Sequence, residues 1–179
     1  MSMAARTVLL IVLIFPLAPC GPAPGAQPVL PPRKVFTPKP PPEQPIPFSH
    51  RTHAGARIAC TGCHTIQAPG DHAGIPSEAV CMGCHTTIRK DSPAIQALAG
   101  FAKANRRVPW VRVYKLPKTV YFSHEVHYRQ AKVECAECHG PVAERDALGQ
   151  EKSIFMSECM ACHDRHKASN KCDLCHDSH

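Results

Sequence analysis

Five times in this 179-residue chain, two cysteines stand three positions apart and a histidine follows the second cysteine directly. In chain order, the first to fifth motifs are Cys60-Thr-Gly-Cys63-His64, Cys81-Met-Gly-Cys84-His85, Cys135-Ala-Glu-Cys138-His139, Cys159-Met-Ala-Cys162-His163 and Cys172-Asp-Leu-Cys175-His176. Cys-x-x-Cys-His is the attachment signature of c-type haem. The two thiols add to the porphyrin vinyl groups, and the imidazole becomes the proximal ligand of the iron. The sequence therefore predicts five covalently attached c-type haems with proximal ligands His64, His85, His139, His163 and His176.

Other uses of paired cysteines account for this pattern less well. Structural zinc sites take four ligands each and give no reason for a histidine after every pair. Disulfide frameworks do not favour closely spaced pairs repeated in this way. Histidine makes up 12 of 179 residues, so five trailing histidines by chance have a probability on the order of one in a million. Ten of the eleven cysteines are therefore assigned to haem attachment.

Seven histidines outside the motifs are candidates for the second axial ligand of each iron: His50, His53, His72, His124, His127, His166 and His179. Two pairs belong to repeated Phe-Ser-His-x-x-His segments, where a three-residue spacing on a helix puts both imidazoles on one face. They can then reach two different haems. The strongest candidates for distal ligands are therefore His50, His53, His124 and His127. For the fifth iron His72 and His166 both remain open, Met156 is a third candidate, and His179 is expected to be a solvated terminal residue.

The chain repeats itself from residue 48 onward. Phe48-Ser49-His50-Arg51-Thr52-His53 corresponds to Phe122-Ser123-His124-Glu125-Val126-His127. In each copy a haem motif begins 10 or 11 residues after the first histidine, and a second motif follows that contains methionine and is preceded by a Ser-Glu pair. This pattern is an internal duplication of a two-haem module, with modules at 48–110 and 120–179. The second copy carries the fifth motif at its end.

The size of the domain limits the fold. Residues 48–179 give each haem about 26 residues, which is too few for a large side-chain core. We therefore expect a mainly irregular chain with short α-helices, almost no sheet, and a core built by the haems. Helices are expected after the haem motifs, especially over Ile95 to Ala104. Because ligation contributes folding free energy, the domain is not expected to fold without haem.

The N-terminus is typical of an export segment. An apolar run from Val8 to Leu17 is shorter than the roughly 20 residues of a bilayer-spanning helix, which predicts a signal peptide over 1–20. Leu17-Ala18-Pro19-Cys20 is similar to a bacterial lipobox, in which Cys20 would be acylated, and cleavage after Ala26 is the alternative that discards Cys20. Haem attachment follows export in bacteria, so we expect a periplasmic protein, membrane-anchored if Cys20 is acylated.

A proline-rich linker is predicted over residues 21–47. Of the 19 prolines, 13 lie within the first 47 residues. Such a segment favours extended polyproline II and cannot fold into a core. We expect either a semi-rigid spacer between a membrane anchor and the haem domain of residues 48–179, or a disordered tail.

The net charge does not indicate a nucleic-acid partner. The formal charge is +7, but five haems with two propionates each add roughly −5 when oxidised, so the loaded protein is close to neutral. Basic residues such as Arg106, Arg107 and Arg112 are expected to offset propionates. The expected partners are therefore redox proteins, and no nucleic acid.

The order Phe-x-His-x-x-His before Cys-x-x-Cys-His resembles class III multihaem cytochromes, the small bis-histidine kind that includes cytochrome c7. The resemblance implies a class III-type fold with a haem core. It also implies four ligand pairs, one for each of the first four motifs: His50 with His64, His53 with His85, His124 with His139 and His127 with His163.

Further stretches resemble the pentahaem cytochrome subunit of alternative complex III, a bacterial quinol-oxidising complex. They are Ala73-Gly74-Ile75-Pro76 before the second motif, residues 110–117 running into Val120-Tyr121-Phe122-Ser123-His124, and Cys138-His139-Gly140. That subunit is held by an N-terminal membrane helix, whereas this chain has a signal-length apolar run. The resemblance implies partners among the other subunits of a membrane respiratory complex.

These features predict electron transfer by a periplasmic, membrane-associated pentahaem cytochrome c in a quinol-oxidising complex, and not an enzyme by itself. One alternative is a free periplasmic shuttle of class III. Another is a multihaem reductase acting on nitrite, hydroxylamine or a sulfur oxyanion, which needs an iron with an open coordination site. Every motif ends in histidine and the spare histidines suffice for all five irons, which favours the electron carrier.

Overall fold

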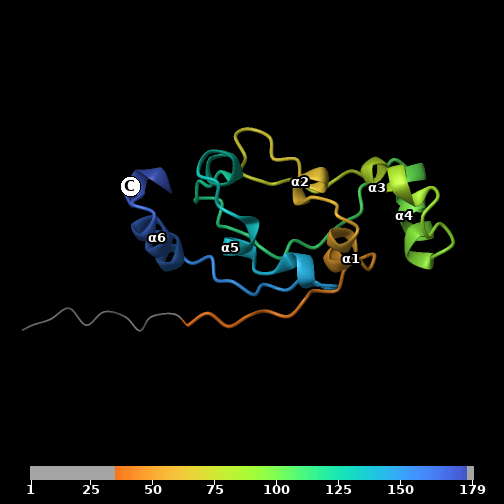
Figure 1. Ribbon diagram of the computed structural model, residues 1–179, viewed down its shortest axis with the longest axis horizontal. Coiled ribbons are helices and arrows are strands. Elements are labelled where there is room, and N and C mark those ends of the chain that lie inside the picture. Colours follow the sequence, from red (N-terminus) through yellow and green to blue (C-terminus); the bar gives the residue numbers. More distant parts are fainter. Residues whose placement is uncertain (1–34, 177–179) are drawn as a thin grey trace, which may run out of the picture. The chain divides into compact units, whose positions relative to one another are not determined.

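The computed structural model describes residues 35–176 (Figure 1). Several sequence predictions therefore lie outside the described residues: the signal peptide over 1–20, the lipidation candidate Cys20, the first part of the linker, and His179. Within the described part of the chain, no helix combines the length and apolar composition that crossing a bilayer requires.

Short helices joined by long irregular segments make up the described chain (Figure 1). The α-helices are α1 (His50–Gly55), α2 (Cys60–Cys63), α3 (Glu78–His85), α4 (Pro93–Lys103), α5 (Cys135–His139) and α6 (Met156–Arg165). A π-helix, η1 (Glu125–Gln130), and two 3-10 turns, η2 (Val142–Glu144) and η3 (Cys172–Leu174), complete the set. Pairing of β type in residues 35–176 is limited to one isolated bridge between Lys39 and Gln150. The predicted fold class is confirmed.

The position of the helices corrects one expectation. Helices were expected after the haem motifs, but each motif itself lies in a helical turn, in α2, α3, α5, α6 or η3. The physical reason is that one helical turn places residues three apart on the same side, as two thiols that share one porphyrin require. The helix expected over Ile95 to Ala104 is present as α4, which begins at Pro93 and ends at Lys103.

The two copies of the ligand helix differ by one inserted residue. In the first copy α1 is an α-helix, in which the amide of Ala56 bonds the carbonyl of Thr52 four residues earlier. In the second copy η1 is a π-helix, in which the amide of Ala131 bonds the carbonyl of Val126 five residues earlier. A π-turn holds one extra residue relative to an α-turn. This explains why the first cysteine follows the first histidine by 10 residues in one copy and by 11 in the other.

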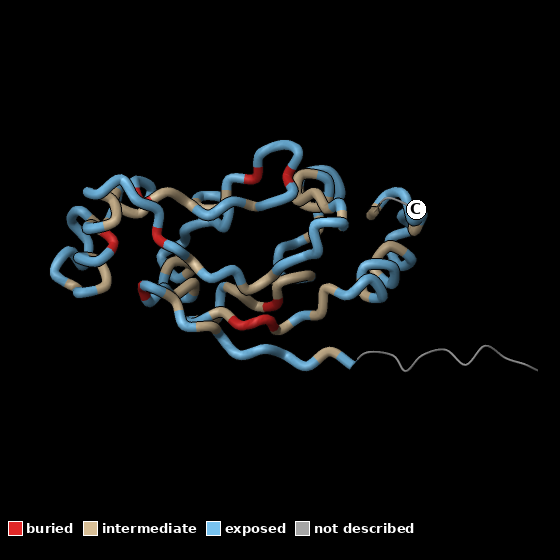
Figure 2. Tube along the Cα trace, turned by 180° about the vertical axis from the view of Figure 1, so that it is seen from behind, coloured by how far each residue is buried: buried red, intermediate tan, exposed pale blue. Residues whose placement is uncertain are grey.

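Side chains alone build little core. Four hydrophobic residues are buried among residues 35–176: Ile46, Ile66, Leu98 and Val108. Three of them form one cluster, against which Trp110 and parts of α3 and α4 pack. Figure 2 shows that most of the described chain is exposed or of intermediate burial. The sparse core fits the expectation that haem supplies much of the interior of this domain.

Residues 35–47, which we call the strap, contribute to this core. Ile46 is 4% exposed and packs with Leu98 and Val108. Gln44 exchanges two hydrogen bonds of 2.9 Å with the backbone of Val111. Further along, Lys39 pairs with Gln150 and Phe36 meets Phe155 edge-on at 6.1 Å. The linker prediction did not include this contact: a proline-rich segment that forms no core of its own still buries Ile46 where the folded domain offers an apolar surface.

Contacts between the modules are also made by α1. The backbone amide of Arg51 donates to the carbonyl of Arg145, and the Arg51 guanidinium donates twice to the carbonyl of Glu144 at 2.9 and 2.6 Å. The Ser49 hydroxyl donates to Asp146 at 2.7 Å. The helix that carries His50 and His53 is thus attached to η2, just after the third motif.

Candidate haem-binding sites

The histidines of the first four motifs each face a histidine from outside the motifs. The ring centroids are 6.5 Å apart for His50 and His64, 6.1 Å for His53 and His85, 6.3 Å for His124 and His139, and 6.1 Å for His127 and His163. The angles between the ring planes are 12°, 66°, 8° and 25° in the same order. These are the four pairs implied by the resemblance to class III cytochromes.

The spacing of the paired rings fits one metal ion between them. An imidazole nitrogen binds a first-row metal at about 2.0–2.1 Å, and the ring centroid lies roughly 1.1 Å behind that nitrogen, so two axial imidazoles have centroids about 6.3 Å apart. All four pairs lie within a few tenths of an ångström of this value. Rings in direct contact would be closer, as Phe48 and His53 are at 4.5 Å. The residues present therefore fit haem iron with two histidine ligands.

One phenylalanine in each copy holds both distal imidazoles. The ring of Phe48 stacks on His53 at 4.5 Å and meets His50 edge-on at 4.8 Å. In the second copy Phe122 does the same for His127 and His124, at 4.5 and 4.8 Å. Because aromatic contacts have preferred geometries, this phenylalanine fixes the planes of both ligands. The sequence pattern included these residues, but their role was not predicted.

Backbone carbonyls fix the tautomer of the ligand rings. A carbonyl oxygen only accepts, so an Nδ1 atom bonded to one carries the proton and leaves Nε2 for a metal. Such bonds run from His53 to Ser49, His127 to Ser123, His64 to Gly74, His85 to Ile88, His163 to Ser169 and His124 to Gly70, at 2.6–3.1 Å. These acceptors are main-chain atoms, so side-chain patterns in the sequence do not reveal them.

Burial favours the neutral form of the central ligands. It lowers the pKa of His50, with smaller contributions from His64 and His53. It also lowers the pKa of His124, although the Gly70 carbonyl acts in the opposite direction. Burial is also the main reason why the pKa of His139 is lowered, and its neighbours His124 and His64 lower it further. Neutral imidazole is the form that binds a metal.

None of the ten cysteines among residues 35–176 is paired with another in a disulfide. Burial, followed by neighbouring thiols, raises the pKa of Cys81, Cys135, Cys138 and Cys159, which keeps these groups protonated. Within residues 35–176, no group of three or more histidine, cysteine or acidic side chains is arranged to hold a metal ion. Neither observation supports the zinc and disulfide alternatives.

At four places a thiol of one motif lies close enough to a thiol of another to raise its pKa: Cys63 acts on Cys81, Cys60 on Cys135, Cys162 on Cys138, and Cys175 on Cys159. Cys60 and Cys135 are within hydrogen-bonding distance. The motifs therefore follow one another in space as second, first, third, fourth and fifth. The two modules meet through their first motifs, and the second and fifth motifs lie at the ends of the series.

The fifth motif lies next to the segment that leads into the second Phe-Ser-His-x-x-His sequence. Its Cys175 carbonyl accepts a 2.6 Å hydrogen bond from the amide of Tyr121. His72 is held instead by Asp71 and by Arg112, whose Nη1 lies 3.2 Å from Nε2. His166 ends α6, where its amide bonds the carbonyl of Cys162. The sixth ligand of this iron stays a prediction between His72 and His166.

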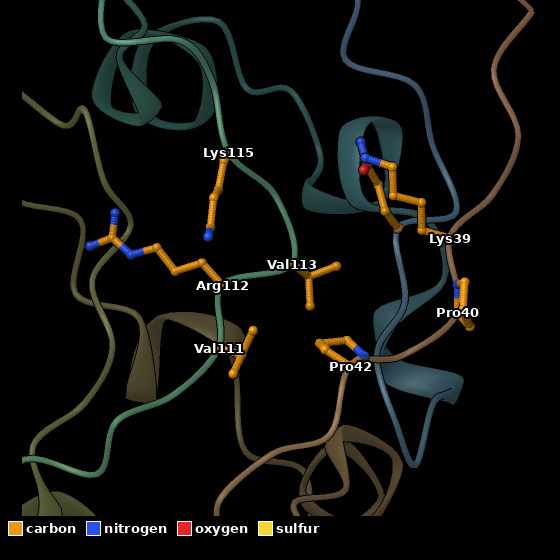
Figure 3. Close-up of a pocket in the computed structure, with 8 residues that line it drawn as sticks. Lys39, Pro40, Pro42, Val111, Arg112, Val113 and Lys115 are labelled. Carbon is orange, nitrogen blue, oxygen red and sulfur yellow. The ribbon is translucent and has the colours of Figure 1, made fainter.

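Basic side chains surround a cavity of about 300 Å³ beside the strap. Lys39, Arg112 and Lys115 line it together with Pro42 and Val113, and Figure 3 shows that the Arg112 side chain extends away from Pro42 and Val113. Tyr114, in the same segment, contacts the ring of His139 edge-on at 4.6 Å. Positive charge this close to a ligand pair suits the carboxylate groups of a porphyrin. Arg107, by contrast, is engaged by the carbonyls of Ile75 and Pro76.

A buried carboxylate anchors α3, the helix of the second motif. Glu78 is 7% exposed, accepts a 2.8 Å hydrogen bond from the amide of Val108, and lies 3.4 Å from Arg107. Burial acts to raise the pKa of Glu78, but the amides of Val108 and of Glu78 itself, together with Arg107, hold it below its ordinary value. The repeated Ser-Glu pair before the methionine-containing motifs was visible in the sequence, but this anchoring role was not predicted.

Comparison with known proteins agrees with this arrangement. Residues 120–177, the second module, match the family of cytochrome c7 and related cytochrome c. The chain is also 30% identical over 161 residues to the multiheme cytochrome c subunit of menaquinone reductase from Nitratidesulfovibrio vulgaris Hildenborough. That match covers 75% of this chain and 77% of the relative. The chain therefore belongs to the class III, cytochrome c7-like family of multihaem cytochromes c, whose haems are covalently attached.

Proposed function

We propose that this protein is a periplasmic electron carrier with five covalent haems and that it works as a subunit of a quinol-linked respiratory complex. The observation that carries the proposal is the set of four imidazole pairs at the spacing of a metal ion, each with one member in a Cys-x-x-Cys-His motif. The relative that is a multihaem cytochrome subunit of menaquinone reductase supports the quinol-linked setting.

The residues of the chain each have a defined task in this function. The thiols would attach each porphyrin, and the two paired imidazoles would bind its iron from the two faces of the ring. Haem iron, when bound, supplies reversible one-electron chemistry. In six of the eight paired rings Nδ1 is bonded to a carbonyl, which leaves Nε2 for a metal. Two imidazoles on one iron would leave no position there for a substrate. Saturation of this kind supports an electron carrier over a reductase.

The continuous series of attachment motifs supports a role in conduction through the protein. Neighbouring motifs are close enough for their thiols to interact, from the second motif at one end to the fifth at the other. We therefore propose that redox partners, other subunits of the complex among them, dock near the second and fifth motifs. A free periplasmic shuttle would use the same two ends.

The test of this proposal combines stoichiometry with spectroscopy. A pyridine haemochrome assay with mass spectrometry is expected to give five haems per chain. The oxidised protein is expected to show only low-spin ferric signals in electron paramagnetic resonance, and the reduced protein is expected not to bind carbon monoxide rapidly. Because such signals depend on the angle between the axial rings, the His53–His85 pair at 66° is expected to give a separate, more anisotropic signal.

Two matched variants identify the ligand of the fifth iron. His72→Ala or His166→Ala is expected to open one iron, which gives a high-spin signal and carbon monoxide binding, while the other variant keeps the parent spectrum. A stoichiometric high-spin haem in the unmodified protein contradicts the electron-carrier proposal and favours a multihaem reductase. Three haems or fewer per chain contradict the assignment of the motifs.

A further inference from the structure

One loop contacts the ligands of both central sites. Residues 65–76, which we call the bridging loop, follow the first motif and belong to the first module. The carbonyl of Gly74 accepts a 2.6 Å hydrogen bond from Nδ1 of His64, the proximal histidine of the first motif. The carbonyl of Gly70 accepts from Nδ1 of His124 at 3.1 Å and from its backbone amide at 2.6 Å. His124 faces His139 of the third motif, so the loop reaches one ligand of each central pair.

The Gly70 end of the loop is locked onto the start of η1. The hydroxyl of Ser123 donates to the carbonyl of Pro69 at 2.5 Å, and the guanidinium of Arg129 donates to the carbonyl of Ile66 at 2.8 Å. Gly70 itself has φ +81°, and a Cβ atom there would lie 2.6 Å from the amide nitrogen of Glu125. Only glycine allows this backbone conformation together with this close approach without strain.

The first module has no equivalent of this lock. The matching serine, Ser49, donates to the carboxylate of Asp146 at 2.7 Å. The matching ligand, His50, has a buried Nδ1 atom without a hydrogen-bond partner in the described structure. At the second ligand of each helix the copies agree, since His53 and His127 bond the carbonyls of Ser49 and Ser123 at 2.7 and 2.8 Å. At the first ligand the copies differ, because only His124 has the bridging loop as the acceptor for its Nδ1 atom.

We propose that the bridging loop is a shared positioning element that sets the reduction potentials of the two central irons together, through the carbonyls of Gly70 and Gly74. This inference rests on the proposed bis-histidine ligation. A carbonyl acceptor on Nδ1 makes an axial imidazole more basic, which stabilises ferric iron and lowers the potential. Both carbonyls belong to one short loop, which is clamped by Ser123 at Pro69 and by Arg107 at Ile75 and Pro76. We expect a change at the Gly70 end to be passed along this loop to Gly74.

The proposed coupling concerns the junction of the modules. The sites of the first and third motifs meet where the modules join, since the Gly70 carbonyl of the first module bonds His124, whose ring faces His139 at 6.3 Å. A loop that holds a ligand on each side of this junction keeps the two potentials matched. The outer pairs, His53–His85 and His127–His163, have separate acceptors at Ser49, Ile88, Ser123 and Ser169.

Ser123→Ala tests this proposal in the full-length holoprotein, with Ser49→Ala as the matched control. Each variant removes a serine hydroxyl that accepts from a helix amide, of Val126 in one copy and Thr52 in the other. Only Ser123→Ala also removes a bond to the bridging loop. We expect Ser123→Ala to raise two of the low-spin potentials in a redox titration followed by electron paramagnetic resonance. A tenfold loss of preference for ferric iron corresponds to about 59 mV.

A second readout does not depend on potentials. The Nδ1 protons of His64 and His124 are expected to exchange slowly with deuterated water in nuclear magnetic resonance spectra. Ser123→Ala is expected to speed the exchange of both, and Ser49→Ala of neither. Gly70→Ala, which forces the loop away from Glu125, is expected to reproduce the effect of Ser123→Ala if the serine variant gives too little holoprotein.

Three results overturn the inference. They are a shift of one central potential alone, no shift in either, and equal shifts in the two serine variants. In each of these cases the unmodified protein still shows low-spin iron with two histidine ligands, so the proposed function stands. A high-spin signal in the unmodified protein is the different result that contradicts the proposed function itself.

Discussion

Replacing Glu78 tests how the second haem motif is held in place. In Glu78→Ala the amide of Val108, whose residue is 4% exposed, loses its acceptor. A buried donor left without a partner costs about 1–3 kcal/mol. The ion pair with Arg107 adds up to about 1 kcal/mol, since the arginine side chain is 59% exposed. Glu78→Gln keeps an oxygen for the Val108 amide, so its expected cost is only the smaller part, up to about 1 kcal/mol.

Trp110 provides the assay, because it is the single tryptophan of the chain and packs against the same core cluster as Val108. Urea unfolding of the holoprotein followed by tryptophan fluorescence is expected to give the order parent, Gln variant, Ala variant. A difference of about 2 kcal/mol with a slope of about 2 kcal/mol per molar shifts the midpoint by about 1 M. Equal midpoints for the Ala and Gln variants would show that the Val108 hydrogen bond does not stabilise the domain.

The difference in stability between the parent protein and Glu78→Gln is expected to depend on pH. The pKa of Glu78 is lowered in the folded protein, so its charge stabilises the fold above the ordinary glutamate pKa of about 4.3. This contribution is lost as the pH falls through the folded-state pKa. The difference in stability between parent and Glu78→Gln is therefore expected at neutral pH and is expected to disappear in acid. A difference that persists unchanged to low pH contradicts the reasoning.

Further predictions concern the aromatic clamp, the haem core and the N-terminus. Phe122→Leu removes two ring contacts, each worth about 0.5–1.5 kcal/mol, so we expect a lower melting temperature and altered low-spin signals. A chain expressed without haem attachment is expected to lack stable helix by circular dichroism, since few side chains are buried. Expressed with its own leader, the protein is expected to fractionate with membranes, and Cys20→Ala is expected to release it. Identical fractionation of the two contradicts lipidation.

The sequence alone predicts the chemistry of the sites, because the residues that attach and ligate haem lie only a few positions apart. Five Cys-x-x-Cys-His motifs predict haem attachment, and the two Phe-Ser-His-x-x-His segments indicate the helices that carry the distal histidines. The pairing of each distal histidine with its motif came from the resemblance to class III cytochromes. The structure brings the same residues together.

What the sequence did not indicate depends on main-chain atoms and on distant segments. The acceptors at Gly70, Gly74 and Ile88 are carbonyl groups, which every residue has, so no side-chain pattern reveals them. Ile46 lies in a proline-rich stretch whose composition predicts a spacer, yet the surface of Leu98 and Val108 buries it. Helices were expected after the haem motifs but lie on the motifs themselves, because the cysteine spacing requires a helical turn.

The π-helix η1 bears on how the two halves of the chain have diverged since the duplication. An inserted residue normally shifts everything after it by a third of a turn, which would carry a ligand away from its metal. Here the extra residue is looped out within η1, and Arg57 and Lys132 end their helices in the same left-handed conformation, with φ of 61° and 57°. The histidine pairs of the two halves keep matching separations on either side of it. An insertion at this point therefore leaves both ligand pairs in place, and a search for half-length relatives gains sensitivity if it lets the gap between histidine and cysteine vary by one.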